Sequence, residues 1–164
     1  MRVKTGDIPI IALLAALIAV TGSFKIPLGI PGAEFQLSAP IAVAIAAVFG
    51  FRRYIIAGIL ASSIMFLLGL HTLFNVEISM IFRLVAGGIV AWFGTSIPVL
   101  ALAGPIGSTA ARWVLGMTLG ISVWPLWFAA LPGMLFTALT VWPLTKILRR
   151  AKEGASGYVK RTTI

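Results

Sequence analysis

Long apolar stretches with few charges recur along the whole chain and limit what it can fold into. A helix of about 18 to 20 apolar residues is long enough to cross the roughly 30 Å hydrocarbon core of a bilayer. The chain has 164 residues, so at this length per span it has room for about six helices and short connections, and for no soluble domain. We therefore expect a single all-α membrane domain over residues 1–164, with six transmembrane helices.

The composition agrees with a membrane protein and excludes other classes. Hydrophobic residues make up 60% of the chain and charged residues only 10%, whereas soluble domains are about 25% charged. The formal net charge is +9, but the basic residues lie between apolar stretches rather than on one shared surface, so no nucleic acid partner is expected. Cysteine is absent, which excludes disulfides, thiolate metal sites and a thiol nucleophile.

Glycine, proline and polar residues divide the apolar stretches into six predicted helices. The first stretch follows two basic residues, as in a cleavable signal peptide, but no Ala-x-Ala site follows it, so we interpret it as the first helix. The Gly104-Pro105 pair either kinks the fifth helix or ends a short turn before it. The predicted helices cover residues 8–21, 37–49, 54–70, 76–93 and 99–120, and a sixth begins between 124 and 133 and ends at 148.

Two segments are predicted to be non-helical. Residues 22–38 contain three glycines and two prolines, which interrupt helices, and form a long loop between the first two helices. Residues 152–164 are polar and are expected to form a basic tail near anionic lipid headgroups.

The distribution of Lys and Arg predicts the orientation in the membrane, because cytoplasmic loops carry an excess of both. Six spans place both termini and the even-numbered connections on one side. The opposite side, which includes the long loop, carries Lys25 alone and is therefore predicted to lie outside. We therefore expect both termini in the cytoplasm, on the side that carries Arg2, Lys4, Arg52, Arg53, Lys146, Arg149, Arg150, Lys152, Lys160 and Arg161.

Arg83 and Arg112 lie inside predicted spans, where an ionisable side chain is costly and usually faces a cavity or a partner. Each lies seven residues from the predicted outer end of its helix, near Val76 and Leu119, which is about 10 Å along the axis. A guanidinium is suited to bidentate recognition of carboxylate or phosphate. The pair predicts a pocket for an anionic group, and the alternative is that Glu77 or another acid pairs with one arginine as a structural bridge.

Other polar and aromatic residues are predicted at the same outer level. Two of them, Trp124 and Trp127, can either line a ligand ring or belong to the aromatic belt of the membrane boundary. His71 is the only histidine, too few for a metal site built on imidazole, and is either a ligand contact or a solvated loop residue. The candidate substrate-binding residues are Lys25, Glu34, Phe35, Gln36, His71, Asn75, Glu77, Arg83, Arg112, Trp124 and Trp127.

Motifs of catalysis are absent from the sequence. There is no glycine-rich phosphate loop with lysine, no His-Glu-x-x-His and no Gly-x-Ser-x-Gly. The four acids, Asp7, Glu34, Glu77 and Glu153, are divided between the two sides of the predicted membrane domain. We expect no enzyme activity, no metal and no cofactor, and no means of driving transport without partner subunits.

The first predicted helix carries two overlapping pairs of alanines four residues apart, Ala12 with Ala16 and Ala15 with Ala19. This spacing places small residues on one face and allows another helix to approach closely.

Taken together, these features resemble the substrate-binding S component of energy-coupling factor (ECF) transporters, which import vitamins and micronutrients. The likeness covers nearly the whole chain: its size, six helices with both ends inside, the alanine pairs and the long loop after the first helix. The resemblance implies that Ala12, Ala15, Ala16 and Ala19 dock onto a transmembrane coupling subunit. It also implies that residues 22–38 close over the substrate, that two cytoplasmic ATPases supply the energy, and that the protein lies in a prokaryotic plasma membrane.

The resemblance bears on the cargo as well. Residues 34–37, 131–134 and 141–143 look most like the subgroups proposed for tryptophan or thiamine precursors. Cobalt and nickel S components have a metal-binding histidine near the extreme N-terminus, where this chain reads Met1-Arg2-Val3, so a metal cargo is not expected. Two other classes stay open: a small oligomeric anion channel or facilitator, and a structural or chaperone-like membrane subunit.

Overall fold

The computed structural model describes residues 6–30, 33–36 and 38–162, of which residues 25–30, 33–36 and 156–162 are described by their backbone alone. This part of the chain forms six helices and one two-stranded sheet, so the predicted number of helices is confirmed. Apart from the end of the last helix, the predicted boundaries lie within three residues of the observed ones. The elements are α1 (Asp7–Ser23), β1 (Lys25–Ile30), β2 (Ala33–Gln36), α2 (Ser38–Phe49), α3 (Phe51–Leu67), α4 (Leu73–Phe93), α5 (Ile97–Leu119) and α6 (Val123–Thr162).

The helices differ in length. Within the described residues, α4, α5 and the stretch Val123–Ala155 of α6 are long and apolar enough to cross a membrane. Helices α1 and α3 have 17 residues each and α2 has 12, which corresponds to about 25 Å and 18 Å of rise. Helix α2 is therefore much shorter than the roughly 30 Å of a hydrocarbon core.

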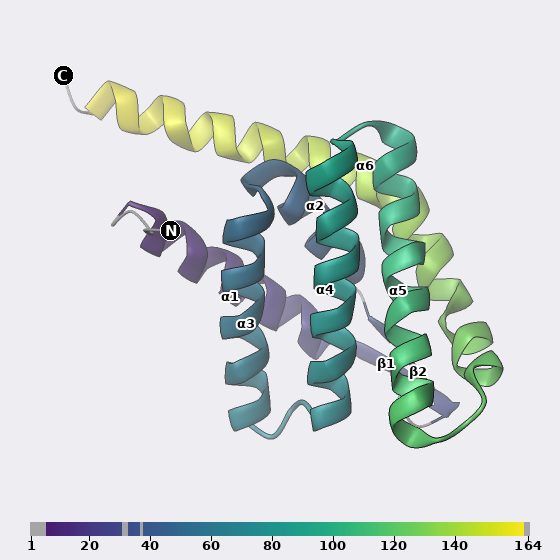
Figure 1. The fold of residues 1–164 in the computed structure, drawn as a ribbon. Coiled ribbons are helices and arrows are strands. Elements are labelled where there is room, and N and C mark those ends of the chain that lie inside the picture. The colour runs from purple at the N-terminus through teal and green to yellow at the C-terminus, as the bar shows by residue number, and fades with distance from the viewer. Residues whose placement is uncertain (1–5, 31–32, 37, 163–164) are drawn as a thin grey trace.

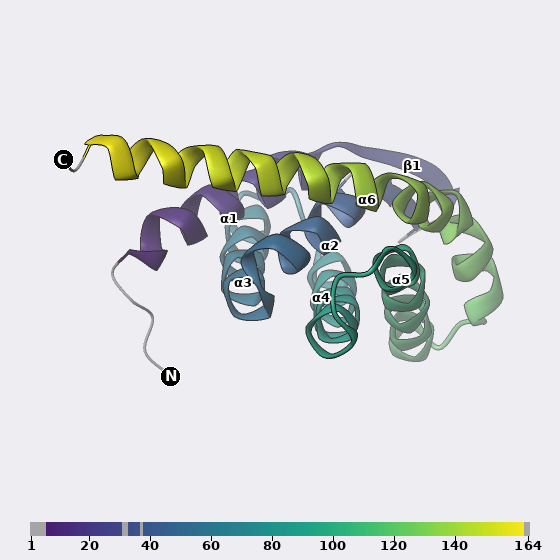
Figure 2. The ribbon, with the colours of Figure 1, turned by 90° about the horizontal axis from the view of Figure 1, so that it is seen from above.

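The helices form two layers. Helices α3, α4 and α5 stand side by side in a row, and α1, α2 and α6 run across one face of that row (Figures 1 and 2). Short as it is, α2 is the central helix, since it contacts each of the other five. Most of its side chains are buried, and several are alanine, which allows neighbouring helices to approach closely.

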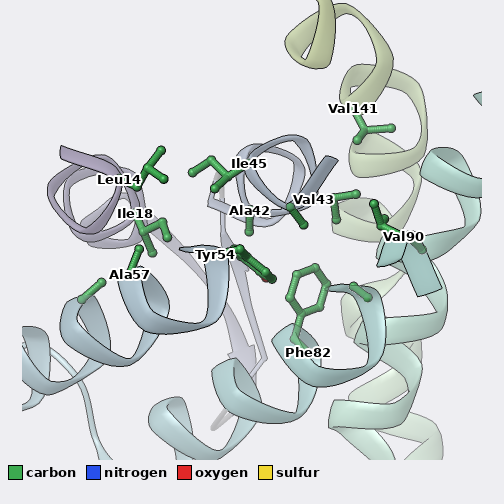
Figure 3. Close-up of a cluster of buried hydrophobic side chains, with 14 of the residues drawn as sticks. Leu14, Ile18, Ala42, Val43, Ile45, Tyr54, Ala57, Phe82, Val90 and Val141 are labelled. Atoms are coloured by element: carbon green, nitrogen blue, oxygen red, sulfur yellow. The ribbon is translucent and has the colours of Figure 1, made fainter. Parts of the chain in front are cut away.

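The apolar core lies between the two layers. Leu14 and Ile18 of α1 and Ile45 of α2 point into it from one layer (Figure 3). Tyr54 of α3 and Phe82 of α4 meet them from the other layer. These contacts hold α2 in place and so determine where its first residue lies.

The predicted loop of residues 22–38 contains a β-hairpin. Strand β1 pairs antiparallel with β2, with Lys25 opposite Gln36 and Ile26 opposite Phe35. The prediction that this segment is not helical is confirmed for residues 25–30 and 33–36, which form strands, whereas Gly22 and Ser23 belong to α1 and Ser38 begins α2. Pairing of the strands satisfies backbone N–H and C=O groups within the protein, which matters where water is scarce.

The prediction that the last helix ends at Leu148 and that residues 152–164 form a tail is wrong for the described part, because α6 continues to Thr162. Arg, Ala, Lys and Glu, which follow Leu148, all favour helix. Lys152 holds this extension against α2: its Nζ donates a hydrogen bond to the Val48 carbonyl oxygen at 2.8 Å and lies 5.3 Å from the centre of the Phe49 ring.

The start of α1 and the extension of α6 make contacts at the same end of the bundle. Arg53, at the start of α3, donates two hydrogen bonds to Asp7 Oδ1, at the start of α1, with the shorter at 2.7 Å. The Lys152 contact places the extension of α6 at the end of α2, directly before α3 begins. The basic residues Arg52, Arg53 and Lys152 therefore lie at one end of the molecule.

Candidate ligand-binding site

Two neighbouring cavities lie between the layers. The larger has a volume of about 70 Å³ and the smaller about 20 Å³. Ile18, Ser38, Ser79 and Arg83 line both, so Arg83 belongs to the wall that they share. The larger cavity is lined by Ile18 of α1, Ser38, Ala39 and Ala42 of α2, Ile78, Ser79, Phe82 and Arg83 of α4, Ser108, Ala111 and Arg112 of α5, and Ala129, Ala130 and Gly133 of α6.

The two arginines within the helices line the same cavity. Arg83 comes from α4 and Arg112 from α5, two helices that stand next to each other in Figure 1. Their side chains are buried, with 6% and 7% of the residue surface exposed. The two arginines are predicted to lie at the same depth in their helices, and their position at one cavity agrees with that prediction.

Within the described part of the chain, no acidic side chain accounts for the burial of Arg83. Among the residues that the structure describes, its Nη1 donates to Ser62 Oγ at 2.7 Å and contacts Met80 Sδ at 3.8 Å, and no carboxylate accepts from it. Glu77, the predicted alternative partner, instead accepts a hydrogen bond at 2.5 Å from Thr118 of α5. A guanidinium has five N–H donors, so Arg83 keeps donors that a ligand in the cavity can use.

Three serines line the cavity together with the arginines and were not among the predicted site residues. Ser79 precedes Arg83 by four residues, and Ser108 precedes Arg112 by four. Residues four apart share one face of a helix. The repeated Ser-x-x-x-Arg spacing was therefore a signal in the sequence that could have identified both serines. Ser38 lines both cavities at the start of α2.

The start of α2 adds positive potential to the cavity. Its first two residues, Ser38 and Ala39, line the larger cavity. The first turn of a helix has backbone N–H groups without partners in the helix and carries a partial positive charge. This end of α2 and the two arginines are all positive, so each of them favours an anion in the cavity.

His71 and Asn75 lie around the start of α4, the helix that carries Arg83. His71 is 8% exposed and lines the smaller cavity with Arg83. The buried Asn75 belongs to the cap of α4: its backbone N–H donates to Thr72 Oγ1 at 3.3 Å, and Thr72 Oγ1 donates to Asn75 Oδ1 at 2.9 Å. Asn75 lines neither of the two cavities. His71 is therefore part of the site geometry, and the bonds between Asn75 and Thr72 cap the first turn of α4.

Trp124 and Trp127 are not lining residues of either cavity. Trp124 is 67% exposed, and Trp127 donates from Nε1 to Thr109 Oγ1 at 3.1 Å. With Phe128 they form an aromatic cluster in which the two indole rings lie 6.4 Å apart, edge to face. This placement fits the alternative prediction of an aromatic belt and does not support contact with a ligand ring.

The four candidates in the hairpin are described by backbone alone. Lys25 lies in β1, and Glu34, Phe35 and Gln36 lie in β2, but their side chains are outside the part that the structure describes. Strand β2 ends two residues before Ser38, which places it within about 7 Å of a cavity-lining residue. Their role in binding stays a prediction.

The alanine pairs of α1 point in different directions. Ala15 is buried and Ala19 is half-buried, on the side of α1 that packs against the bundle. Ala12 and Ala16 are exposed. Of the four alanines predicted to dock onto another subunit, Ala12 and Ala16 are therefore accessible, and Ala15 is buried inside the bundle.

The size and lining of the cavity suit capture of an anion. A volume of about 70 Å³ accepts on the order of five water molecules, which is enough for a small acid or for the acidic end of a larger molecule. Among the described residues, no three His, Asp or Glu side chains lie close enough to share a metal ion, and no Asp or Glu lines the larger cavity.

The chain is similar over 156 residues to a protein named Protein BioX from Lysinibacillus sphaericus. The two sequences are 60% identical, and the match covers 95% of this chain and 94% of that protein. No family model matches the chain, and no solved structure matches it.

Proposed function

This chain belongs to the family of Protein BioX, and on that basis we propose that it is the substrate-binding S component of an ECF-type importer. It captures a small water-soluble nutrient that carries a carboxylate or another anionic group. The observation that carries the proposal is that Arg83 and Arg112 are both buried at one cavity that no described acid lines. The match covers nearly all of both proteins, so the helix bundle that holds this cavity is what they have in common.

The proposed orientation follows from the charges. The end of the bundle with Arg52, Arg53 and the basic extension of α6 faces the cytoplasm, because short cytoplasmic segments are enriched in Lys and Arg. The hairpin and the connection between α3 and α4 then lie outside. In this orientation the ligand enters from the outer side, beside the hairpin, and the chain is a multi-pass protein of a prokaryotic plasma membrane.

Energy for import comes from other subunits in this proposal. The chain binds the nutrient and catalyses no reaction, and a transmembrane coupling subunit with two cytoplasmic ATPases moves the cargo inward. The exposed pair Ala12 and Ala16 on α1 supports such an assembly, because small residues four apart allow close approach of another helix.

Native mass spectrometry of the chain purified alone in detergent tests the proposal. We expect a monomer that carries a nutrient from the host in a one-to-one complex, or that takes one up from a panel of biotin, pantothenate, tryptophan and thiamine precursors. Thermal unfolding should shift upward with the same compound, because a ligand that binds only the folded state stabilises it. An oligomer without ligand would contradict the proposal and favour an anion channel.

Docking through α1 gives a separate prediction. We expect Ala16→Trp to abolish co-purification of the chain with a co-expressed ECF coupling subunit and its ATPases, because the large ring prevents close helix approach. Affinity purification followed by quantification of the ATPases measures this. Leu84→Trp is the matched control, since Leu84 is 55% exposed on α4, away from α1. Equal recovery of the ATPases with both variants would mean that α1 is not the docking helix.

A further inference from the structure

The side chain of Arg83 packs across the surface of α3 at the position of a glycine. Gly58 is buried, and a Cβ atom at that position would overlap Nε and Cδ of Arg83 and lie 3.1 Å from its Cζ. One turn further along α3, the Oγ of buried Ser62 accepts the hydrogen bond from Arg83 Nη1. Since residues four apart lie on the same face of a helix, Gly58 and Ser62 form one continuous surface beneath the guanidinium and its stem.

We propose that Gly58 and Ser62, together called the Arg83 seat, are positioning residues that determine where Arg83 presents its guanidinium to the cavity. This inference rests on the proposed function, in which Arg83 binds an anionic group. The glycine provides the space in which the guanidinium lies, and the serine holds one of its two terminal nitrogens. The remaining donors are then in place before an anion arrives, and such preorganisation reduces the entropy cost of binding.

Other glycines in the bundle make a different kind of contact. A Cβ at Gly104 would meet Thr137 of α6, and one at Gly107 would meet Ala86 of α4. Those neighbours are short side chains fixed to their own helices, so these glycines allow helices to pack. At Gly58 the neighbour is the long, flexible side chain of an ionic group. Gly58→Ala can therefore be accommodated by movement of Arg83, with the helices left in place.

The position of Arg83 can be measured without a nutrient. In protein labelled with ¹⁵N-arginine and held in detergent micelles, the Nε–H cross-peak of Arg83 is identified by its loss in Arg83→Lys. We expect Gly58→Ala to move or broaden this peak, because the new methyl group occupies the place of Nε. The matched control is Gly88→Ala on α4, where a Cβ meets nothing within 4 Å. The peak should stay unchanged in that variant.

Binding is measured with sodium acetate as the carboxylate probe, against sodium chloride at equal ionic strength. In the wild type we expect the Arg83 peak to shift and saturate with acetate. Gly58→Ala and Ser62→Ala should each require about tenfold more acetate, since each misplaces a charge-assisted contact. Gly88→Ala and Ser63→Ala, which changes the exposed neighbour of Ser62, should titrate as the wild type does.

A double-mutant cycle separates positioning from general damage to the fold. Acetate binding in the Arg83→Ala background is followed on the Arg112 peak. An alanine at position 83 has no Cδ, Nε or Cζ to meet the new methyl group, so Gly58→Ala should cost little in this background. An equal cost in both backgrounds would overturn the inference.

The inference also fails if Gly58→Ala leaves the Arg83 peak and its acetate titration unchanged. It is equally overturned if acetate binding weakens while the Arg83 peak stays in place. A wild type that takes up none of the nutrients in the panel would count against the S component proposal alone, because the peak position and the acetate titration still decide the role of the seat.

Discussion

Arg83→Ala and Arg112→Ala are each expected to weaken binding of the anionic nutrient by about 2–5 kcal/mol, which is about 30-fold to 4,000-fold. Both side chains are buried at the cavity. When one arginine is removed, the ligand carboxylate loses charge-assisted hydrogen bonds. Little water is present in the buried cavity to replace them. Isothermal titration calorimetry in detergent measures the loss, with the compound that native mass spectrometry identifies in the wild type.

Two controls accompany this experiment. Arg52→Ala changes an exposed arginine at the start of α3 and should leave affinity unchanged. If the nutrient is a carboxylic acid, its methyl ester should bind the wild type weakly and lose little more in either arginine variant, because the charge that the arginines recognise is already gone. Wild-type affinity in both alanine variants would show that the ligand binds elsewhere.

Gly107→Leu is expected to lower the thermal unfolding midpoint of the protein by about 3–10 °C. A Cβ at Gly107 would lie 2.9 Å from Ala86 Cβ, 3.2 Å from Phe82 Cδ2 and 3.3 Å from the Ala86 backbone nitrogen. Ala86 Cβ is fixed to its backbone, so α4 and α5 must move apart, and overpacking of this kind costs about 1–3 kcal/mol. Thermal unfolding of the ligand-free protein in one detergent measures the difference.

Gly88→Leu is the matched substitution, because a Cβ there meets nothing within 4 Å. It replaces glycine by a better helix former and should leave stability unchanged or raise it slightly. If Gly107→Leu unfolds at the same temperature as the wild type, the contact between α4 and α5 is looser than the structure indicates.

The helices could be predicted from the sequence because membrane spans leave a strong local signal. Apolar runs, ended by residues such as Gly50 and Gly94, determine where each helix begins and ends within a few residues. The hairpin could not be predicted in this way. Pro27 and Gly29 are unfavourable in strands, so the pairing of β1 and β2 depends on contacts between them that a local pattern does not contain.

The extension of α6 could not be predicted for a related reason. After Leu148 the chain becomes polar, a pattern typical of a terminal tail, although Arg, Ala, Lys and Glu all favour helix. What holds this part is a long-range contact from Lys152 to the end of α2. A pairing between residues about a hundred positions apart leaves no trace in local composition.

The candidate site was predictable only for its charged members. Arg83 and Arg112 are conspicuous because arginine is rare within apolar spans. Ser79 and Ser108 could be found only by relating them to the arginines four residues later. Gly58 could not be found at all, since its importance depends on which side chain of a neighbouring helix passes over it. The direction in which Trp124 and Trp127 point depends on the rotation of α6, which their spacing does not determine.

The short central helix α2 links ligand binding to folding. Its rise of about 18 Å is roughly two helical turns less than the thickness of a hydrocarbon core. Its first residues line the cavity, so an occupant of the cavity takes space that a longer helix would fill with its own side chains. The empty protein is in this sense incompletely packed. Under the proposed function the nutrient completes the core, and the free energy of its capture is also free energy of folding.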